Sequence, residues 1–295
     1  MKKNSLILIL GVFALCTSCV KEVAFDNQLI EPKLVIQGLI EVDSTFAVYL
    51  EHTHAFNEPN TYAGITSGAT ITVVNLTTGN TYITSTPADS NRYELPFNVA
   101  PNTGYQITVT HPDYPTVTAT TYTTQAIPLI SVDTGSFNME GIPKISGLMK
   151  WQDPPGNQFY MVCVYSEGVD SASNIQFSNS VFGSDDPIVS ESFSLDPGDH
   201  NSSTYFVFSD EQFANSMKTF RTYFDKIYVD ESIGGNSSSI RFTLISMNQD
   251  TYSYYKSMLI QQDSDPTFSE PVKIYSNVTN GYGIFGSVSG SKIIL

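Results

Sequence analysis

Apolar and polar residues alternate in short runs along most of the chain, which is the pattern of half-buried β-strands. The run TFAVYLEH (45–52), for example, places Phe46, Val48 and Leu50 on one face. About seven such runs, separated by turns rich in Gly, Pro, Asn and Asp, have the spacing of an immunoglobulin-like sandwich. They predict strands at 33–40, 45–52, 69–76, 80–86, 92–97, 104–111 and 116–124. We therefore expect an immunoglobulin-like β-sandwich over residues 33–125.

Residues 126–295 continue with strand-like runs and predict a second, β-rich domain with one or two short helices. The main helix is expected near 250–262, where Asp250 can cap the N-terminus and Tyr254, Met258 and Leu259 fall on one face. A further short helix is expected over 209–220. The predicted fold class is all-β, with two β-sandwich domains.

The N-terminus departs from the β pattern. Lys2 and Lys3 precede an apolar run of ten residues (6–15), and small residues then lead to Cys19. A membrane-spanning helix needs about 20 apolar residues, so this run predicts a signal peptide instead. The small residues before Cys19 resemble a bacterial lipoprotein box, with residues 1–18 as signal and 19–32 as a lipidated tether.

Lipidation of Cys19 predicts a stable membrane anchor. Each methylene of a palmitate-like acyl chain contributes about 0.8 kcal/mol when it is buried in the bilayer, and several chains add up. Cys16 is a poorer acceptor because Leu15, which precedes it, is not small. The alternative is a soluble secreted protein with an incidental cysteine. The Lys-Glu pair after Val20 resembles a surface-export tag, so we expect an outer-membrane lipoprotein on the cell surface.

The charge of the chain limits its classes of partner, and its cysteine content limits its disulfides. The chain has a formal net charge of −15 and no cluster of Lys or Arg, which argues against a nucleic-acid partner. Removal of the signal and lipidation of Cys19 leave only Cys163, so no intrachain disulfide is expected. Cys163 lies in the apolar run FYMVCVYS, which favours a buried small hydrophobe over a catalytic thiol.

The C-terminal third carries a family resemblance. DTYSYYKSMLIQQ (250–262) followed by FSEPVKIYSNVTNGYGIFGS (268–287) resembles the C-terminal signature of the domain-of-unknown-function 4249 (DUF4249) family. The matching positions are Tyr252, Tyr255, Glu270, Pro271, Asn277, Gly281, Gly283, Phe285 and Gly286. The resemblance implies a Bacteroidota surface lipoprotein and, by association, a TonB-dependent outer-membrane receptor as partner. It implies no functional residues. The glycines indicate a turn and a close approach of the backbone to a neighbouring segment. A nucleotide-binding glycine loop leads into a helix, whereas a strand-like run follows here, which argues against such a loop.

Several residues are candidates for chemistry. His52 and His54 would share one face of a strand and could bind a metal, but no third ligand is visible, so two exposed polar residues are the simpler interpretation. The acidic stretches 195–200 and 261–266 are sparser than a dedicated calcium loop. We therefore predict no metal and no cofactor.

Three tyrosines, Tyr252, Tyr254 and Tyr255, crowd the predicted helix and form a possible binding surface for sugars or proteins. The favoured alternative is that two of them pack against a sheet and the third stays half-exposed.

No catalytic motif is present, so we expect a non-catalytic binding accessory of an outer-membrane transporter. A glycan-binding or adhesion protein is the alternative, and an envelope hydrolase is a third hypothesis.

Overall fold

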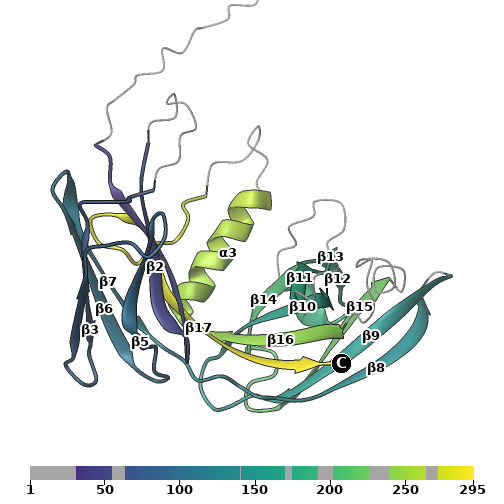
Figure 1. The fold of residues 1–295 in the computed structure, drawn as a ribbon. Helices are drawn as coiled ribbons and strands as arrows, with labels where there is room; N and C mark the ends of the chain where they lie inside the picture. Colours follow the sequence, from purple (N-terminus) through teal and green to yellow (C-terminus); the bar gives the residue numbers. More distant parts are fainter. Residues whose placement is uncertain are drawn as a thin grey trace, which may run out of the picture. The chain divides into compact units, whose positions relative to one another are not determined.

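The computed structural model describes seven stretches of the chain: residues 31–54, 64–139, 141–169, 175–191, 202–225, 239–263 and 272–295. These stretches are almost entirely β-structure, with one α-helix, α3 (Gln249–Asp263), and one short 3-10 helix, η1 (Pro187–Glu191) (Figure 1). No helix among them is both long and apolar enough to cross a bilayer. The predicted all-β fold class with short helices is confirmed.

The first sandwich contains the strands expected from the alternating pattern. They are β1 (Leu34–Glu41), β2 (Thr45–His52), β3 (Thr70–Asn75), β4 (Thr81–Thr84), β5 (Arg92–Asn98), β6 (Gly104–His111) and β7 (Tyr114–Tyr122). One layer has the order β1-β2-β5 and the other β4-β3-β6-β7, an immunoglobulin-like arrangement. The alternation places Phe46, Val48 and Leu50 in the core between the layers, as predicted.

The second sandwich uses longer strands. They are β8 (Leu129–Met139), β9 (Ile142–Gln152), β10 (Phe159–Val169), β11 (Ile175–Asn179), β12 (Phe182–Gly183), β13 (Ser202–Ser203), β14 (Tyr205–Ser209), β15 (Met217–Asp225), β16 (Ser239–Met247) and β17 (Tyr282–Ile294). One layer has the order β13-β12-β15-β9-β8, and it packs on the layer that contains β10 and β16. Trp151 lies fully buried in the core between them.

A single eight-stranded sheet runs through both sandwiches, because β17 pairs in parallel with β1 and antiparallel with β16. The last strand thus contributes Phe285 to the first core, although the sequence partition assigned residues 126–295 entirely to a second domain. Residues 32–295 form one compact unit. The division into two domains, 33–125 and 126–295, therefore stays a prediction.

The pairing register shows that both smaller layers cover the same face of the shared sheet. Phe285 faces the first core, and Ile293, eight residues further along β17, faces the second. Buried serines lie between them, and Ser287 Oγ donates to Tyr122 O at 3.1 Å. The Leu129 amide donates to Ser291 Oγ at 2.9 Å. The segment that joins the two sandwiches therefore crosses β17 over small polar side chains.

The glycine-rich stretch before β17 has the close contacts that its sequence indicated. Gly283 has a φ of 95°, and a Cβ there would lie 2.0 Å from Ile36 O on the parallel neighbour β1. The Asn277 side chain bonds both backbone groups of Phe285, donating to its oxygen at 2.8 Å and accepting from its amide at 2.9 Å. These residues build the junction between β17 and the first sandwich.

Helix α3 packs on the opposite face of the shared sheet, where Leu259 joins Met161, Cys163 and Met247 in a third apolar cluster. Its N-cap is Asn248 and not Asp250, since the Thr251 amide donates to Asn248 Oδ1 at 3.1 Å. The expected cap is wrong by two residues because β16 ends at Met247 and the helix begins at once.

The short helix expected over 209–220 is wrong. Residues 211–215 form turns, with the Phe213 amide bonded to Asp210 O at 2.9 Å and the Ser216 amide to Phe213 O at 3.0 Å. Met217 then starts β15, because nine consecutive residues from Met217 onward pair with β9 as a neighbouring strand. Asn215, at a φ of 59°, marks the break between the turns and the strand.

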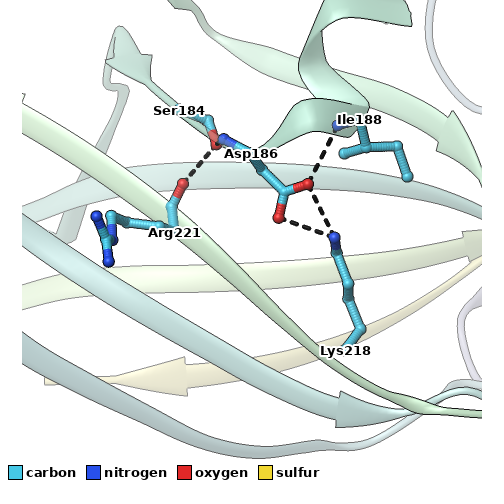
Figure 2. A network of polar contacts seen from close by, with 5 residues as sticks. All are labelled: Ser184, Asp186, Ile188, Lys218 and Arg221. Atoms are coloured by element: carbon cyan, nitrogen blue, oxygen red, sulfur yellow. Dashed lines mark hydrogen bonds and ion pairs between the residues drawn. The ribbon is translucent and has the colours of Figure 1, made fainter. Parts of the chain in front are cut away.

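The 3-10 helix η1, which the sequence did not suggest, is held against β15 by a buried ion pair (Figure 2). Lys218 Nζ lies 2.8 Å from both carboxylate oxygens of Asp186, whose side chain is 9% exposed. The same carboxylate accepts from the Ile188 amide at 3.2 Å, and Ser184 Oγ donates to Arg221 O at 2.6 Å. This network fixes the chain after β12.

Candidate functional site

The predicted lipid-attachment residue, Cys19, lies outside the described residues, as does the acidic stretch 195–200. Of the stretch 261–266, the part beyond Asp263 also lies outside them. These predictions therefore remain predictions.

His52 and His54 are both described and lie near each other at the end of β2. Their ring centroids are 5.7 Å apart, and the His52 ring stacks on Tyr114 at 5.7 Å. His52 Nδ1 lies 3.1 Å from Thr53 O. The described residues contain no group of three or more His, Cys, Asp or Glu side chains able to hold a metal ion. The structure thus adds no third ligand to the pair.

The three tyrosines of α3 differ in their surroundings. Tyr252 and Tyr255 pack on the third apolar cluster, with Tyr252 stacked on Phe159 at 4.6 Å and Tyr255 against Tyr205 at 5.9 Å. Tyr254 is half-buried and contacts the edge of Tyr255. Two tyrosines therefore support the helix on the sheet, as the packing interpretation expected.

Cys163 belongs to the same cluster and is buried. Burial raises the pKa of its thiol to about 11, which keeps the thiol neutral at physiological pH. A neutral, enclosed thiol is a poor nucleophile, in agreement with the structural role expected from the sequence.

A groove of about 500 Å³ lies beside the N-terminal half of α3, and we call it the α3 groove. It forms where the ends of β14, β10 and β16 meet, since Phe159 pairs with both Ser209 and Met247. The chain leaves these strand ends as the turn at Asp210 and as helix α3. Its lining side chains are Asn157, Phe159, Ser209, Asp210, Glu211, Gln249, Tyr252, Ser253 and Lys256.

The wall of the α3 groove combines aromatic, amide and charged groups. Stacked Phe159 and Tyr252 provide the aromatic surface, and Lys256 Nζ lies 5.6 Å from the Tyr252 ring centroid. Asn157 and Gln249 are exposed at its edge. A volume of this size lies in the range of small-ligand sites. Seven of the nine lining side chains are polar or charged, and the two stacked rings form its apolar part.

Asp210 is the most unusual group in the α3 groove. It is 4% exposed, and its Oδ2 atom is buried with no hydrogen-bond partner among the described residues. Buried carboxylates are ordinarily paired with a cation or with hydrogen-bond donors. No ion pair to Asp210 occurs within the described part of the chain.

A second buried carboxylate, Asp153, is 1% exposed and lies close enough to Asp210 for the two charges to interact. Its oxygens accept from Tyr160 Oη at 2.5 Å and from the Asn215 amide at 2.7 Å. Burial raises the pKa of Asp153, the two hydrogen bonds oppose that rise, and the negative charge of Asp210 adds to it. Burial and the bond to Asp153 also raise the pKa of Tyr160.

A second hollow of about 460 Å³ lies along α3 and shares Ser253 and Lys256 with the α3 groove. It is bounded by Lys273 and Tyr275 from the chain before β17. Tyr275 Oη donates to Asp250 Oδ1 at 2.5 Å, and burial raises the pKa of Tyr275 to about 12. Asp250 thus ties this segment to α3 in place of capping the helix.

Sequence reasoning located Tyr252 but missed Asp153, Asp210 and Lys256. The available signal was a charged residue directly after an apolar strand, as in YFVFSD, and an Asp after the buried Trp of KWQD. Both positions read equally well as turn residues, so burial could not be inferred.

The family described as "Domain of unknown function (DUF4249)" matches residues 20–294. No curated protein is significantly similar to the chain. Among solved structures, a segment of two fibronectin type III domains from chicken tenascin is similar at 14% identity. That match covers 73% of this chain and 90% of the tenascin chain, with a TM-score of 0.22.

Proposed function

Because the chain belongs to the DUF4249 family, to which no activity is assigned, we propose its function from its own residues. The protein is a non-catalytic, lipid-anchored protein of the outer membrane that binds a ligand in the α3 groove. It acts there as an accessory of a TonB-dependent transporter. The observation that carries the binding role is the α3 groove, with its stacked aromatic wall and its buried carboxylate.

The lipid anchor rests on the signal sequence and is tested at Cys19. The Cys19→Ala variant should lose incorporation of labelled palmitate and leave the membrane fraction. Cys16→Ala is the matched control, since it should leave both unchanged. A Cys19→Ala protein that still carries palmitate would contradict the assignment.

The transporter role is tested by recovering the lipidated chain from native membranes together with its neighbours. A TonB-dependent receptor should accompany the wild-type chain. A Ser253→Trp variant, which fills the α3 groove from a half-buried position, reports whether the groove takes part in that contact. Recovery without any envelope protein, even at low detergent, would contradict the role.

Glycan binding is the second candidate, favoured by the Tyr252 ring and the amides of Asn157 and Gln249 in one groove. Aromatic faces stack on sugar rings, and amides bond hydroxyls. A glycan array should then give binders that Ser253→Trp abolishes. An array without a binder would remove this candidate.

A further inference from the structure

We infer that a third hollow, at the junction of the two sandwiches, binds an uncharged carbohydrate. It has a volume of about 500 Å³ and lies along residues 123–128, which join β7 to β8, so we call it the linker hollow. Both sandwiches belong to one compact unit, and junctions of this kind are frequent places for ligand sites of this size. The inference goes beyond the role proposed for the α3 groove, because it names another site and the class of its ligand.

Side-chain amides are concentrated around the linker hollow. Five of its eleven lining residues are Asn or Gln, although these two types make up only 30 of the 295 residues of the chain. None of the eleven, all of which lie in the described part of the chain, is ionisable. The five amides are those of Asn102, Gln125, Gln152, Asn157 and Gln158.

The fold brings these amides together from four separate segments. Asn102 lies in the turn between β5 and β6, Gln125 in the joining segment, and Gln152 at the end of β9, whereas Asn157 and Gln158 directly precede β10. The first two side chains meet, since Asn102 Nδ2 donates to Gln125 Oε1 at 3.4 Å. Four of the five residues are exposed, and Gln158 is half-buried. The amide-lined surface is therefore open to a ligand from solvent.

The hydrogen bonds within the fold leave part of each amide available. Gln152 Nε2 donates to Asp153 O at 3.1 Å, and Gln158 Nε2 donates to Pro155 O at 3.4 Å. The Oε1 atoms of both glutamines have no partner among the described residues, and neither has the side chain of Asn157. An amide both donates and accepts, as a sugar hydroxyl does, so a row of amides can bond successive hydroxyls of a sugar.

The lining argues against charged ligands. A phosphate backbone needs cationic side chains, and a metal ion or an organic amine needs carboxylates. The linker hollow is lined by neither. The net charge of −15 also repels acidic polysaccharides, so the carbohydrate that fits best is uncharged.

The joining segment is poorly suited to a peptide, whose main chain would also bond amides. The Ile127 amide donates to Ser246 Oγ at 3.4 Å, and the Leu129 amide donates to Ser291 Oγ at 2.9 Å. Pro128 between them has no amide hydrogen. Three consecutive residues thus lack a free main-chain donor, which a peptide that adds a strand would require.

The experiment probes an array of neutral and acidic glycans with the labelled mature chain, and the best neutral binder is then titrated calorimetrically. The combined variant Asn102→Ala and Gln125→Ala should weaken its binding about tenfold, as expected for two lost neutral hydrogen bonds. The matched control combines Asn80→Ala with Gln106→Ala, two exposed amides of the first sandwich outside the hollow, and should leave binding unchanged. N-acetyl-tetraalanine amide serves as the peptide comparison and should not compete.

An array without a neutral binder, a preference for acidic glycans, full competition by the peptide, or an unaffected Asn102→Ala and Gln125→Ala variant would each overturn the inference. The proposed function is tested separately, because neither Asn102 nor Gln125 lines the α3 groove and Ser253 does not line the linker hollow. If Ser253→Trp abolishes glycan binding and the double variant does not, the α3 groove is the glycan site and the linker hollow is not. If only the double variant weakens binding, the linker hollow binds the glycan independently of the α3 groove.

Discussion

Two carboxylates of the second sandwich, Asp186 and Asp210, are both removed from water but differ in what surrounds them. Asp186 contacts the ammonium of Lys218 with both oxygens and accepts from the Ile188 amide (Figure 2). Asp210 is more deeply buried, yet its Oδ2 has no partner among the described residues. The fold supplies partners to both oxygens of Asp186, whereas one oxygen of Asp210 is enclosed without a partner in the described part of the chain.

The difference separates a carboxylate that the fold pairs with a cation from one whose Oδ2 has no partner among the described residues. A buried ion pair with further hydrogen bonds holds two segments in one geometry, as η1 is held on β15. A buried charge that the fold leaves unpaired costs stability, and such a cost is typical of functional sites.

The largest effect is expected from Lys218→Met, which leaves Asp186 buried without its cation. We expect a loss of about 3–5 kcal/mol in the free energy of unfolding, measured in urea at neutral pH. Lys150→Met is the matched control, because its pair with Asp133 is exposed and such pairs contribute about 0–1 kcal/mol. Adding Asp186→Leu to Lys218→Met should recover part of the loss. Equal losses for the two lysine variants would contradict the structural role of Asp186.

The next effect is expected from Tyr160→Phe, which makes Asp153 resemble Asp210 by removing one of its donors. The loss should be about 1.5–3 kcal/mol at pH 7, because hydrogen bonds to charged groups have this size. The hydrogen bond lowers the pKa of Asp153 against the opposing effect of burial, so the variant raises that pKa further.

The pH dependence of the Tyr160→Phe effect follows from the rise in the pKa of Asp153. A carboxyl whose folded pKa is raised favours the folded state below its unfolded pKa, and this contribution is lost as the pH rises through the folded pKa. The variant should therefore lose less stability near pH 4 than at pH 7. A loss independent of pH would show that Asp153 does not titrate in this range.

A smaller effect of opposite sign is expected from Asp210→Asn. Removing an unpaired buried charge should raise the free energy of unfolding by about 1 kcal/mol, whereas Asp186→Asn should lower it. Thermal or urea unfolding of the two variants side by side measures the contrast. A similar destabilisation of both would mean that a protein group pairs with Asp210 in solution.

The smallest effect is expected at Cys163, whose buried thiol stays protonated. Its pKa of about 11 leaves less thiolate at pH 8 than a free cysteine has, so iodoacetamide should not label the folded chain. Labelling should appear only in denaturant, with mass spectrometry as the readout. Rapid labelling of the folded chain would show that the third apolar cluster opens.

Local patterns predicted the strands well and the polar connections poorly. Alternation identified β1 to β7, and the helical spacing of Tyr254, Met258 and Leu259 predicted the helix near 250–262, which the structure places at Gln249–Asp263. The cap at Asn248 and the turns at 211–215 were missed, because Asn, Asp and Ser suit caps and turns alike. Tyr252 was found as a candidate through composition, whereas Asp210 looked like any turn residue.

The sequence by itself determined the all-β class, the positions of the first seven strands, the main helix and the apolar surroundings of Cys163, since these depend on side-chain period and on local composition. Only the tertiary structure decided that β17 pairs with β1 across the whole chain and so joins both cores in one sheet. It alone placed Asp210, Tyr252 and Lys256 around one groove. The reason is physical: burial and partnership of a polar group are properties of its neighbours in space, and those neighbours come from distant strands.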